Sequence, residues 1–395
     1  MKLFSKSYLE IGKVGLFELL IAIYPIIAGY AYGMIHLNDI MLFGLCVMAY
    51  RKMHLLRQYK HFKILALLIV LHETLLWIYL PNMPLYMFNN TLSILLYILS
   101  ISIIVPAINF KKYIHSLVLV SIICTIGLVY HFLLVKMGHS VSPIKLPFFP
   151  DLPQTSRLYE VGNRPVSFFW EPASYANYML IPMMYFLIRR KFLIVTAIMF
   201  ALFLSTSSTG VLLSLIMLFM YSVLGKNTKI WLRVFLFIFL LVMIFVLLNT
   251  DIFSASVNKI QDTDVETTSR LFNGPELFRI MPFSYFITGV PYANITDYFF
   301  QSAEGHMSFL MVKEDTVFIP TFYLIIAKYG IVVFLVYLYS YIKPLYKNME
   351  LLPYVSVLFI AFFFASTALG ANYAYQMIFI YAYIKNKSLK DECKS

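Results

Sequence analysis

An arginine and a glutamate lie in the stretch RPVSFFWEPASYANYM, residues 164–179, just before a long apolar run. Pro172 suits the first turn of a helix, so Glu171 is expected at the N-terminal edge of that helix. Two interpretations are open. In the structural one, Glu171 stabilises the helix dipole and pairs with Arg164. In the functional one, Arg157 and Arg164 bind a diphosphate, because guanidinium matches phosphate oxygens well.

A second pair of arginines occurs further along the chain. Arg270 and Arg279 stand on either side of Glu276. We expect Gly274-Pro275 between them to begin a helix, since proline fits the first helical turn. The two arginines either bond carboxylates of their own loop or bind phosphate.

Three residues are candidates for a base that accepts a proton. His306 and Asp315 precede the apolar run that starts near residue 316, and Glu171 is the third. A histidine titrates near neutral pH, which suits proton transfer. For His306 the alternative is an ordinary loop histidine.

The composition indicates a polytopic membrane protein. Of the 395 residues, 61% are hydrophobic, 17% aromatic and only 13% charged, whereas a soluble domain has about 25% charged residues. We therefore predict an all-α membrane helix bundle with about twelve spans. The apolar runs lie at about 14–36, 37–50, 63–80, 91–110, 113–135, 174–188, 192–206, 210–224, 230–248, 316–342, 352–370 and 371–384.

Charge predicts the orientation of these spans. With both termini cytoplasmic, the cytoplasmic segments hold 22 of the 31 basic residues and the external segments hold 8. Basic residues are retained on the cytoplasmic side, so this orientation is expected. The net charge of +12 is then a topology signal, and no nucleic-acid partner is predicted.

Two long loops stand out on the predicted external side. Residues 1–395 form a single integral-membrane domain, and the loops run over about 136–173 and 249–315. Long loops in a compact protein are usually functional. These two carry 12 of the 19 acidic residues, so any chemistry is expected outside.

Ionisable residues inside predicted spans are costly and often functional. The candidates are Glu18, which can reach the cytoplasmic interface, and the mid-span residues His72, Glu73 and Lys328. Lys328 is expected to pair with His72 or Glu73. A transporter would use such groups to couple an ion.

A short turn in STSSTGVLLSLIMLF, residues 205–219, lies between two predicted spans. Ser207, Ser208 or Thr209 can cap the following helix, and Gly210 permits close packing. The N-terminus of such a helix is also a ready anion site.

The sequence lacks the motifs that bind several classes of cofactor. The glycine loop GxxxxGK[ST], the zinc motif HExxH and the serine-nucleophile elbow are absent, so no cofactor is predicted. Asp262-Thr263-Asp264 looks like the metal motif of nucleotide-sugar enzymes, but those substrates are cytoplasmic and this loop is predicted outside. We predict no metal. Cys46, Cys124 and Cys393 indicate no disulfide framework.

Three stretches together resemble a known family, the Wzy-type bacterial polysaccharide polymerases of the O-antigen ligase and polymerase superfamily. RPVSFFWEPASYANYM resembles their arginine, aromatic and Glu-Pro segment, and LSTSSTGVLLSLI resembles their Ser-x-x-Gly turn. TSRLFNGPELFRIMPFSYFITGVPYAN resembles the segment that begins with Ser-Arg in their large external loop. The match spans about residues 150–340, in order. The final TFYLIIAKYGIVVFLVYLY resembles the helix after that loop.

The chain also departs from that pattern. The turn has Ser208-Thr209-Gly210 where many relatives carry an arginine. Related ligases have His-Asn at the start of the helix after the large loop, and here that place reads Glu314-Asp315-Thr316. Neither Arg270 nor Arg279 has a glycine sixteen residues later.

The resemblance implies an activity in the bacterial cytoplasmic (inner) membrane. Such enzymes transfer a growing glycan from undecaprenyl diphosphate to a new lipid-linked repeat unit, which makes O-antigen, capsular polysaccharide or exopolysaccharide. Donor, acceptor, the lipid bilayer and a chain-length regulator protein would be the partners. Arg157, Arg164, Arg270 and Arg279 would bind the diphosphate, and Glu171, His306 or Asp315 would be catalytic.

Three alternatives stay open. An O-antigen ligase would move a finished chain to a lipid core, and the missing His-Asn argues against it. A flippase or transporter suits twelve spans, but its charges are expected in a central cavity. An O-acetyltransferase would place its histidines on the cytoplasmic side, where His54 and His61 lie in a basic segment.

Overall fold

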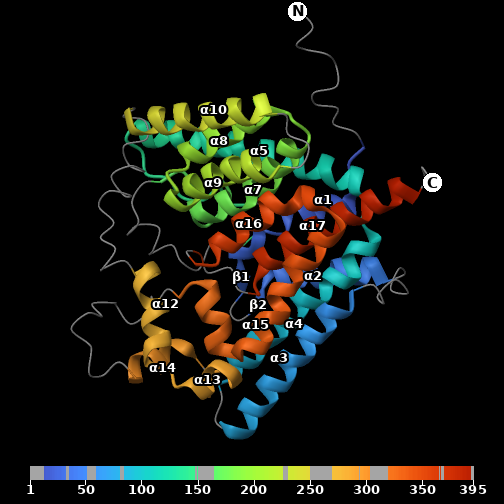
Figure 1. Cartoon of the computed structure of the whole chain (residues 1–395), viewed down its shortest axis with the longest axis vertical. Coiled ribbons are helices and arrows are strands. Elements are labelled where there is room, and N and C mark those ends of the chain that lie inside the picture. The colour runs from blue at the N-terminus through green and yellow to red at the C-terminus, as the bar shows by residue number, and fades with distance from the viewer. Residues whose placement is uncertain are drawn as a thin grey trace, which may run out of the picture.

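Helices make up almost the whole of the described chain. The computed structural model describes residues 13–32, 35–50, 59–80, 84–146, 149, 164–225, 230–249, 269–292, 294–302, 319–363, 365 and 369–392. Apolar runs form helices because only a helix pairs all the N–H and C=O groups of one segment internally. Figure 1 shows these helices packed side by side, with the C-terminus on the right.

The elements follow one another along the chain as follows. They are α1 (Leu16–Ile23), η1 (Ile27–Gly29), β1 (Ala31–Tyr32), β2 (Ile35–His36), α2 (Leu37–Ala49), α3 (Lys60–Tyr79), α4 (Leu85–Ile104), η3 (Val105–Ala107), α5 (Phe110–Lys136), α7 (Pro172–Ile188), α8 (Phe192–Leu204), α9 (Ser208–Leu224), α10 (Ile230–Asn249), α12 (Ser269–Ile280), α13 (Phe283–Thr288), α14 (Ile295–Ser302), α15 (Thr321–Lys347), η6 (Met349–Leu351), α16 (Leu352–Ala361) and α17 (Ala371–Glu392). The two short strands pair antiparallel, with Ala31 opposite His36.

Four helices of the described chain are long and apolar enough to cross a membrane. These are α3, α4 with η3, α5 and α15, and α2, α8, α9 and η6 with α16 are shorter apolar helices. The predicted all-α class is confirmed, and the four helices indicate a bilayer environment. The count of about twelve spans stays a prediction. The single span predicted at about 14–36 is wrong, because α1 ends at Ile23 and a 3-10 turn and the β1–β2 hairpin follow.

The outer surface of the bundle carries large apolar side chains. Trp231 on α10 is 82% exposed and Ile78 on α3 is 71% exposed. Apolar surface of this extent marks a membrane contact.

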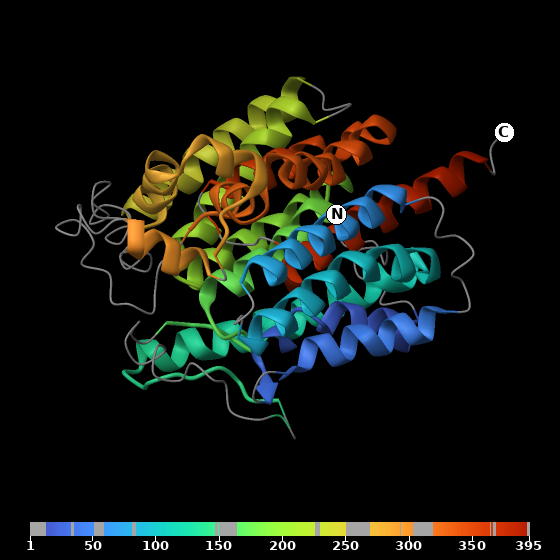
Figure 2. The same cartoon turned by 90° about the horizontal axis from the view of Figure 1, so that it is seen from below.

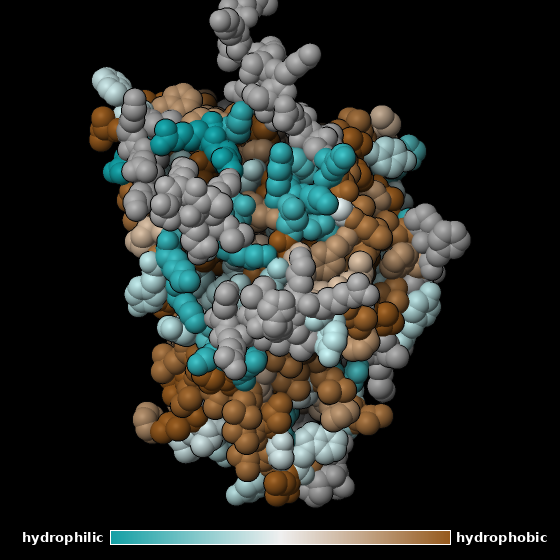
Figure 3. Space-filling view, turned by 90° about the vertical axis from the view of Figure 1, so that its right-hand side faces the viewer, coloured by the Kyte–Doolittle hydropathy of each residue, from teal (hydrophilic) through white to brown (hydrophobic). Residues whose placement is uncertain are grey.

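One end of the bundle, here called the terminal end, is basic. It is defined by the last turns of α17, where Lys385 Nζ donates to the carbonyl of Pro106 at 2.7 Å and Lys387 Nζ to Asn348 Oδ1 at 3.0 Å. Figure 3 views the molecule from the side of the C-terminus and shows hydrophilic side chains gathered in its upper half. Exposed lysines and arginines stand at the neighbouring helix ends: Lys111, Lys112, Arg189, Arg190 and Lys347.

The opposite end carries three short helices. Helices α12, α13 and α14, here called the cap, pack on α15, and Figures 1 and 2 place them at the end away from the C-terminus. The helix start predicted at Gly274-Pro275 is wrong, since α12 runs through both residues. Gly274 lies flat against the ring of Tyr323, where a Cβ would come within 2.3 Å of a ring carbon. This packing overrides the local helix-breaking signal.

Helices α7, α8 and α9 form a tight group that also holds α10 and α16 through α9. The closest approach is at Gly210, where a Cβ would lie 2.4 Å from the Cβ of Ala176 on α7. The close packing predicted for Gly210 is therefore confirmed.

We predict that Gly210→Val lowers the free energy of unfolding by about 1–3 kcal/mol, the usual cost of overpacking a tight contact. Thermal unfolding of the detergent-solubilised protein would measure the change. Gly44→Ala is the matched control, because a Cβ there meets nothing within 4 Å. An equal effect of the two substitutions would contradict the prediction.

Candidate functional site

The segment 164–171 is fixed on α5 through Ser167. Its backbone N–H donates to His131 Nδ1 at 3.1 Å and its hydroxyl donates to the carbonyl of Cys124 at 2.7 Å. Ser167 has φ of 58°, a left-handed conformation that these two bonds hold in place. Gly127 leaves space for the hydroxyl of Ser167, because a Cβ at position 127 would lie 2.8 Å from Ser167 Oγ. The segment before α7 is thus held in a defined conformation.

Arg164 joins this segment to the turn between α8 and α9. Its Nε donates to Thr206 Oγ1 at 3.1 Å, and its terminal Nη2 donates to the backbone carbonyl of the same residue. Thr206 has φ of 54°, so its carbonyl is turned out of the helix it follows. The guanidinium therefore stands directly at the α8–α9 turn.

Glu171 is the N-cap residue of α7 and Pro172 occupies the first turn, as the sequence predicted. Ser174 Oγ donates to Glu171 Oε1 at 3.5 Å. A carboxylate at this point is stabilised by the positive end of the helix dipole. Glu171 is half-buried, so its carboxylate is within reach of solvent at the start of α7.

The N-terminus of α9 lies beside that of α7. Ser207 is the N-cap, and its hydroxyl accepts from the N–H of Gly210 at 3.2 Å. The contact of Gly210 with Ala176 packs the first turn of α9 against the second turn of α7. The Arg164 guanidinium, on the α8–α9 turn, thus lies at the start of α9, and the start of α7 packs alongside. Backbone N–H groups and a guanidinium together favour an anion.

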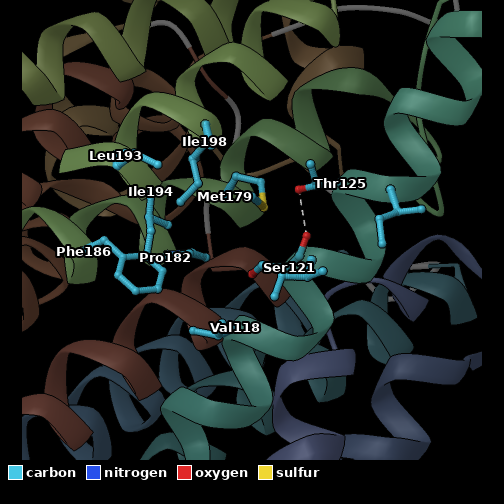
Figure 4. A pocket seen from close by; sticks show the side chains of 12 residues that line it. Val118, Ser121, Thr125, Met179, Pro182, Phe186, Leu193, Ile194 and Ile198 are labelled. Carbon is cyan, nitrogen blue, oxygen red and sulfur yellow. Dashed lines mark hydrogen bonds between the residues drawn. The ribbon is translucent and has the colours of Figure 1, made fainter. Parts of the chain in front are cut away.

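An apolar groove runs beside the same helices. Figure 4 shows its lining side chains, which come from α5, α7 and α8. Its volume is about 280 Å³. The hydroxyls of Ser121 and Thr125 are turned to their own helix, donating to the carbonyls of Leu117 and Ser121 at 2.7 and 2.8 Å. The rim residue Leu193 is 73% exposed, so the groove opens to the apolar surroundings of the bundle.

The two arginines of the second loop lie on one helix, α12. Arg279 donates to Glu276 with two nitrogens, Nε at 2.7 Å and Nη2, which is the carboxylate bond of the structural interpretation. This pairing raises the pKa of Arg279 above its ordinary value, so its charge is constant. Nine residues make two and a half helical turns, so Arg270 starts from the opposite face of α12. The side chain of Arg270 lies outside the described residues.

A buried ion pair lies deeper in the bundle. Lys328 Nζ on α15 lies 3.6 Å from Glu73 Oε1 on α3, with side chains 19% and 4% exposed. The expected pairing of Lys328 with a residue of α3 is confirmed. Glu18 is 6% exposed and accepts from the backbone N–H of Asn109 at 3.0 Å, just before Lys111 and Lys112 at the terminal end. That it reaches the cytoplasmic interface stays a prediction.

The remaining predicted residues cannot be placed. Arg157, His306 and Asp315 lie outside the described residues, as do Asp262 and Asp264. Within the described part of the chain, no group of three or more histidines, cysteines or acidic residues is arranged to hold a metal ion. The prediction of no metal and no cofactor remains a prediction.

Sequence reasoning missed two features that build the site. One is the anchoring of Ser167 by His131, for which the only signal was a histidine in an apolar run. The other is Thr206, whose left-handed backbone presents a carbonyl to Arg164. Non-glycine residues adopt this conformation uncommonly, so the residue type at position 206 gives no direct signal for it.

We expect His131→Phe to loosen the segment 164–171, since it leaves the Ser167 N–H buried without an acceptor at a cost of about 1–3 kcal/mol. Hydrogen exchange of the Ser167 amide would measure this. His139→Phe is the control, because His139 is exposed at the end of α5. Unchanged protection of the Ser167 amide in the first variant would refute the anchoring role.

Comparisons with protein-family models, with curated protein sequences and with the solved structures find no match for this chain.

Proposed function

We propose that this chain polymerises undecaprenyl-diphosphate-linked oligosaccharide repeat units on the external face of the bacterial cytoplasmic membrane. One observation carries the proposal. The guanidinium of Arg164 lies at the start of α9 and the start of α7 packs alongside, and the quoted motifs supply all three parts. A diphosphate is the anion that such a set of donors suits.

The reaction has one bond made and one broken. A hydroxyl oxygen of the acceptor sugar bonds to the anomeric carbon of the donor glycan, and the bond from that carbon to the diphosphate oxygen breaks. The leaving diphosphate keeps the electron pair, and the donors around Arg164 stabilise its added charge. The hydroxyl proton passes to a base, for which Glu171 is the described candidate. His306 and Asp315 remain candidates outside the described residues.

The apolar groove supports the lipid-linked part of the proposal. Thr206, which Arg164 contacts, follows α8, and Ile198 in the groove lining lies eight residues earlier. Eight residues of helix span about 12 Å. A polyprenyl chain attached to a diphosphate near Arg164 would therefore reach the groove within its first few isoprene units. A sugar nucleotide has no such hydrocarbon and gains nothing from the groove.

The same proposal gives the setting. Both termini lie in the cytoplasm, in keeping with the basic terminal end, and the cap and Arg164 face outward. The product is O-antigen, capsular polysaccharide or exopolysaccharide. A chain-length regulator protein is the expected partner.

A transporter or flippase is the second candidate, because one observation favours it. The Glu73–Lys328 ion pair lies beside a break in α15 at Gly330. Broken helices with buried ionisable groups are common at transporter binding sites.

Deletion of the gene in its own host separates these functions. A polymerase deletion leaves glycan cores with a single repeat unit on a gel and no long ladder. A ligase deletion leaves cores with no repeat unit and lipid-linked polymer outside. Repeat units trapped inside the cell would mean a flippase and would overturn the proposal.

We predict that Arg164→Ala lowers polymer formation about 10²–10³-fold, the usual loss when one donor to a developing negative charge is removed. Polymer made from lipid-linked repeat units by the purified protein in vesicles is the measurement. Arg189→Ala is the matched control, because Arg189 is exposed at the terminal end, where its guanidinium lies 5.7 Å from the ring centroid of Tyr185. Full polymer yield from the Arg164 variant would rule out the diphosphate role.

Glu171→Gln tests the base separately. The amide oxygen still accepts from Ser174, whereas a proton can no longer be taken up, so the rate is expected to fall about 10²–10⁴-fold at unchanged thermal stability. The initial rate against pH is the measurement. A variant that keeps its rate would show that another residue, such as His306 or Asp315, is the base.

A further inference from the structure

Helix α15 is interrupted where the cap meets the bundle. Gly330 has φ of 81° and ψ of 170°, values outside the helical range, so the turn before it loses part of its regular hydrogen bonding. The carbonyl of Ala327 in that turn instead accepts from the N–H of Val290 at 2.8 Å, just after α13. The backbone after α13 thus docks on the broken part of α15.

Two glycines make this contact possible. A Cβ on Gly289 would lie 2.4 Å from the carbonyl oxygen of Lys328, and a Cβ on Gly330 would lie 2.1 Å from the carbonyl oxygen of Ile287. Both glycines have φ of 81°, a conformation that other residues rarely adopt. The contact between α13 and α15 therefore requires glycine at both positions.

Helix α3 holds the same contact from the other side. Lys328, in the turn before the break, pairs with Glu73 at 3.6 Å and lies 5.0 Å from the ring centroid of Tyr329. The ring of His72 packs edge-on against Tyr329 at 5.2 Å, and its Nε2 lies 2.8 Å from the place of a Cβ on Gly289. His72 and Glu73, which are neighbours on α3, thus lie against both α15 and the backbone after α13.

The pair is buried and its geometry is loose. Both carboxylate oxygens of Glu73 and the hydroxyl of Tyr329 accept or donate no hydrogen bond within the described part of the chain. The distance of 3.6 Å exceeds a hydrogen bond, so Glu73 and Lys328 interact through the attraction between their charges, beside the ring contact of His72 with Tyr329. In a low-dielectric interior this attraction is strong, whereas an unpaired charge is strongly unfavourable.

We propose that Glu73 and Lys328 are positioning residues for the cap. Their ion pair fixes the turn of α15 on which α13 docks, and so sets where α12 and its arginines stand relative to the bundle. The helix break is then an attachment point that ties the cap to α15 and, through α15, to α3. The effect on polymerisation rests on the function proposed above, whereas the effect on the cap position does not.

Distance measurement between spin labels tests the cap position directly. Labels replace Phe283 on α13 and Tyr79 on α3, which are both 79% exposed, in a background where the three cysteines are changed to alanine. The distance distribution is expected to be narrow in the unmodified background. Glu73→Gln and Lys328→Met should each broaden it and lower the thermal stability, because each leaves one buried charge unpaired.

The double variant Glu73→Gln/Lys328→Met separates position from folding. With both charges removed, its thermal stability should return to near that of the background, while the distance distribution stays broad. The matched control is Glu350→Gln/Lys387→Met, a half-exposed pair with a 3.1 Å separation at the terminal end, which should leave the distribution narrow. A narrow distribution in the stable Glu73/Lys328 double variant would overturn the positioning role.

Polymer formation by the double variant in vesicles is the second readout. A displaced cap should lower kcat about tenfold to a hundredfold, as small misplacements of binding groups do. If the unmodified protein makes no polymer, the proposed function fails while the distance result still decides the positioning role. If the double variant keeps its kcat although the distribution broadens, the cap position does not set the rate and the proposal is overturned for that step.

Discussion

The need to pair every backbone N–H and C=O group in a medium without water governs this molecule. Where a helix ends or breaks inside the bundle, another group takes up its carbonyls. The N–H of Val290 donates to the carbonyl of Ala327, and the N–H and the hydroxyl of Thr321 both donate to the carbonyl of Ala365. Lys385 Nζ donates to the carbonyls of Val105, Pro106 and Ile108. The irregular segments of the described chain therefore occur where partners are close, and these are also the places where a site can be built.

Between α15 and α17, buried polar side chains are paired with one another through tyrosine hydroxyls. Tyr337 and Tyr341 share a hydrogen bond of 3.2 Å between their hydroxyls, and Tyr341 also donates to Gln376 at 3.2 Å. Ser340 and Tyr373 join the same group at 3.0 Å. These bonds link α15 to α17 without burying an ionised group, because a tyrosine side chain is an apolar ring with one polar hydroxyl. The core between these helices thus needs no ion pair, which makes the Glu73–Lys328 pair near the cap the more distinctive.

Much of the helical layout could be predicted from hydropathy, but the break points could not. The apolar runs at 63–80, 113–135 and 192–206 correspond to α3, α5 and α8, because a long apolar run permits little else. The run at 14–36 looked equally continuous and yet holds a hairpin after α1. Gly274-Pro275 looked like a helix start and lies within α12. In both places tertiary packing decides, and a window of local sequence does not contain that information.

The candidate site was likewise predictable from the sequence only in part. Glu171 with Pro172 and Ser207 with Gly210 were predictable, because capping residues act within a few positions of the helix start. Arg164 was predictable as a residue type, whereas its bond to Thr206 was not, since that partner lies 42 residues away and depends on two left-handed backbone conformations. The Glu73–Lys328 pairing was expected only because few ionisable residues lie in the spans.

The proposed function would place an anion at a site assembled from helix ends. The donors at the starts of α7 and α9 are backbone groups held by the contact of Gly210 with Ala176, and they cannot turn away as a long side chain can. Such preorganised dipoles lose little energy in reorganisation when charge develops nearby. Arg164 is held at two points on Thr206, so it too is fixed in direction. Under the proposed function, backbone dipoles at this end of the bundle would supply what ionised side chains supply in a soluble enzyme, which is compatible with the charge-poor composition of the chain.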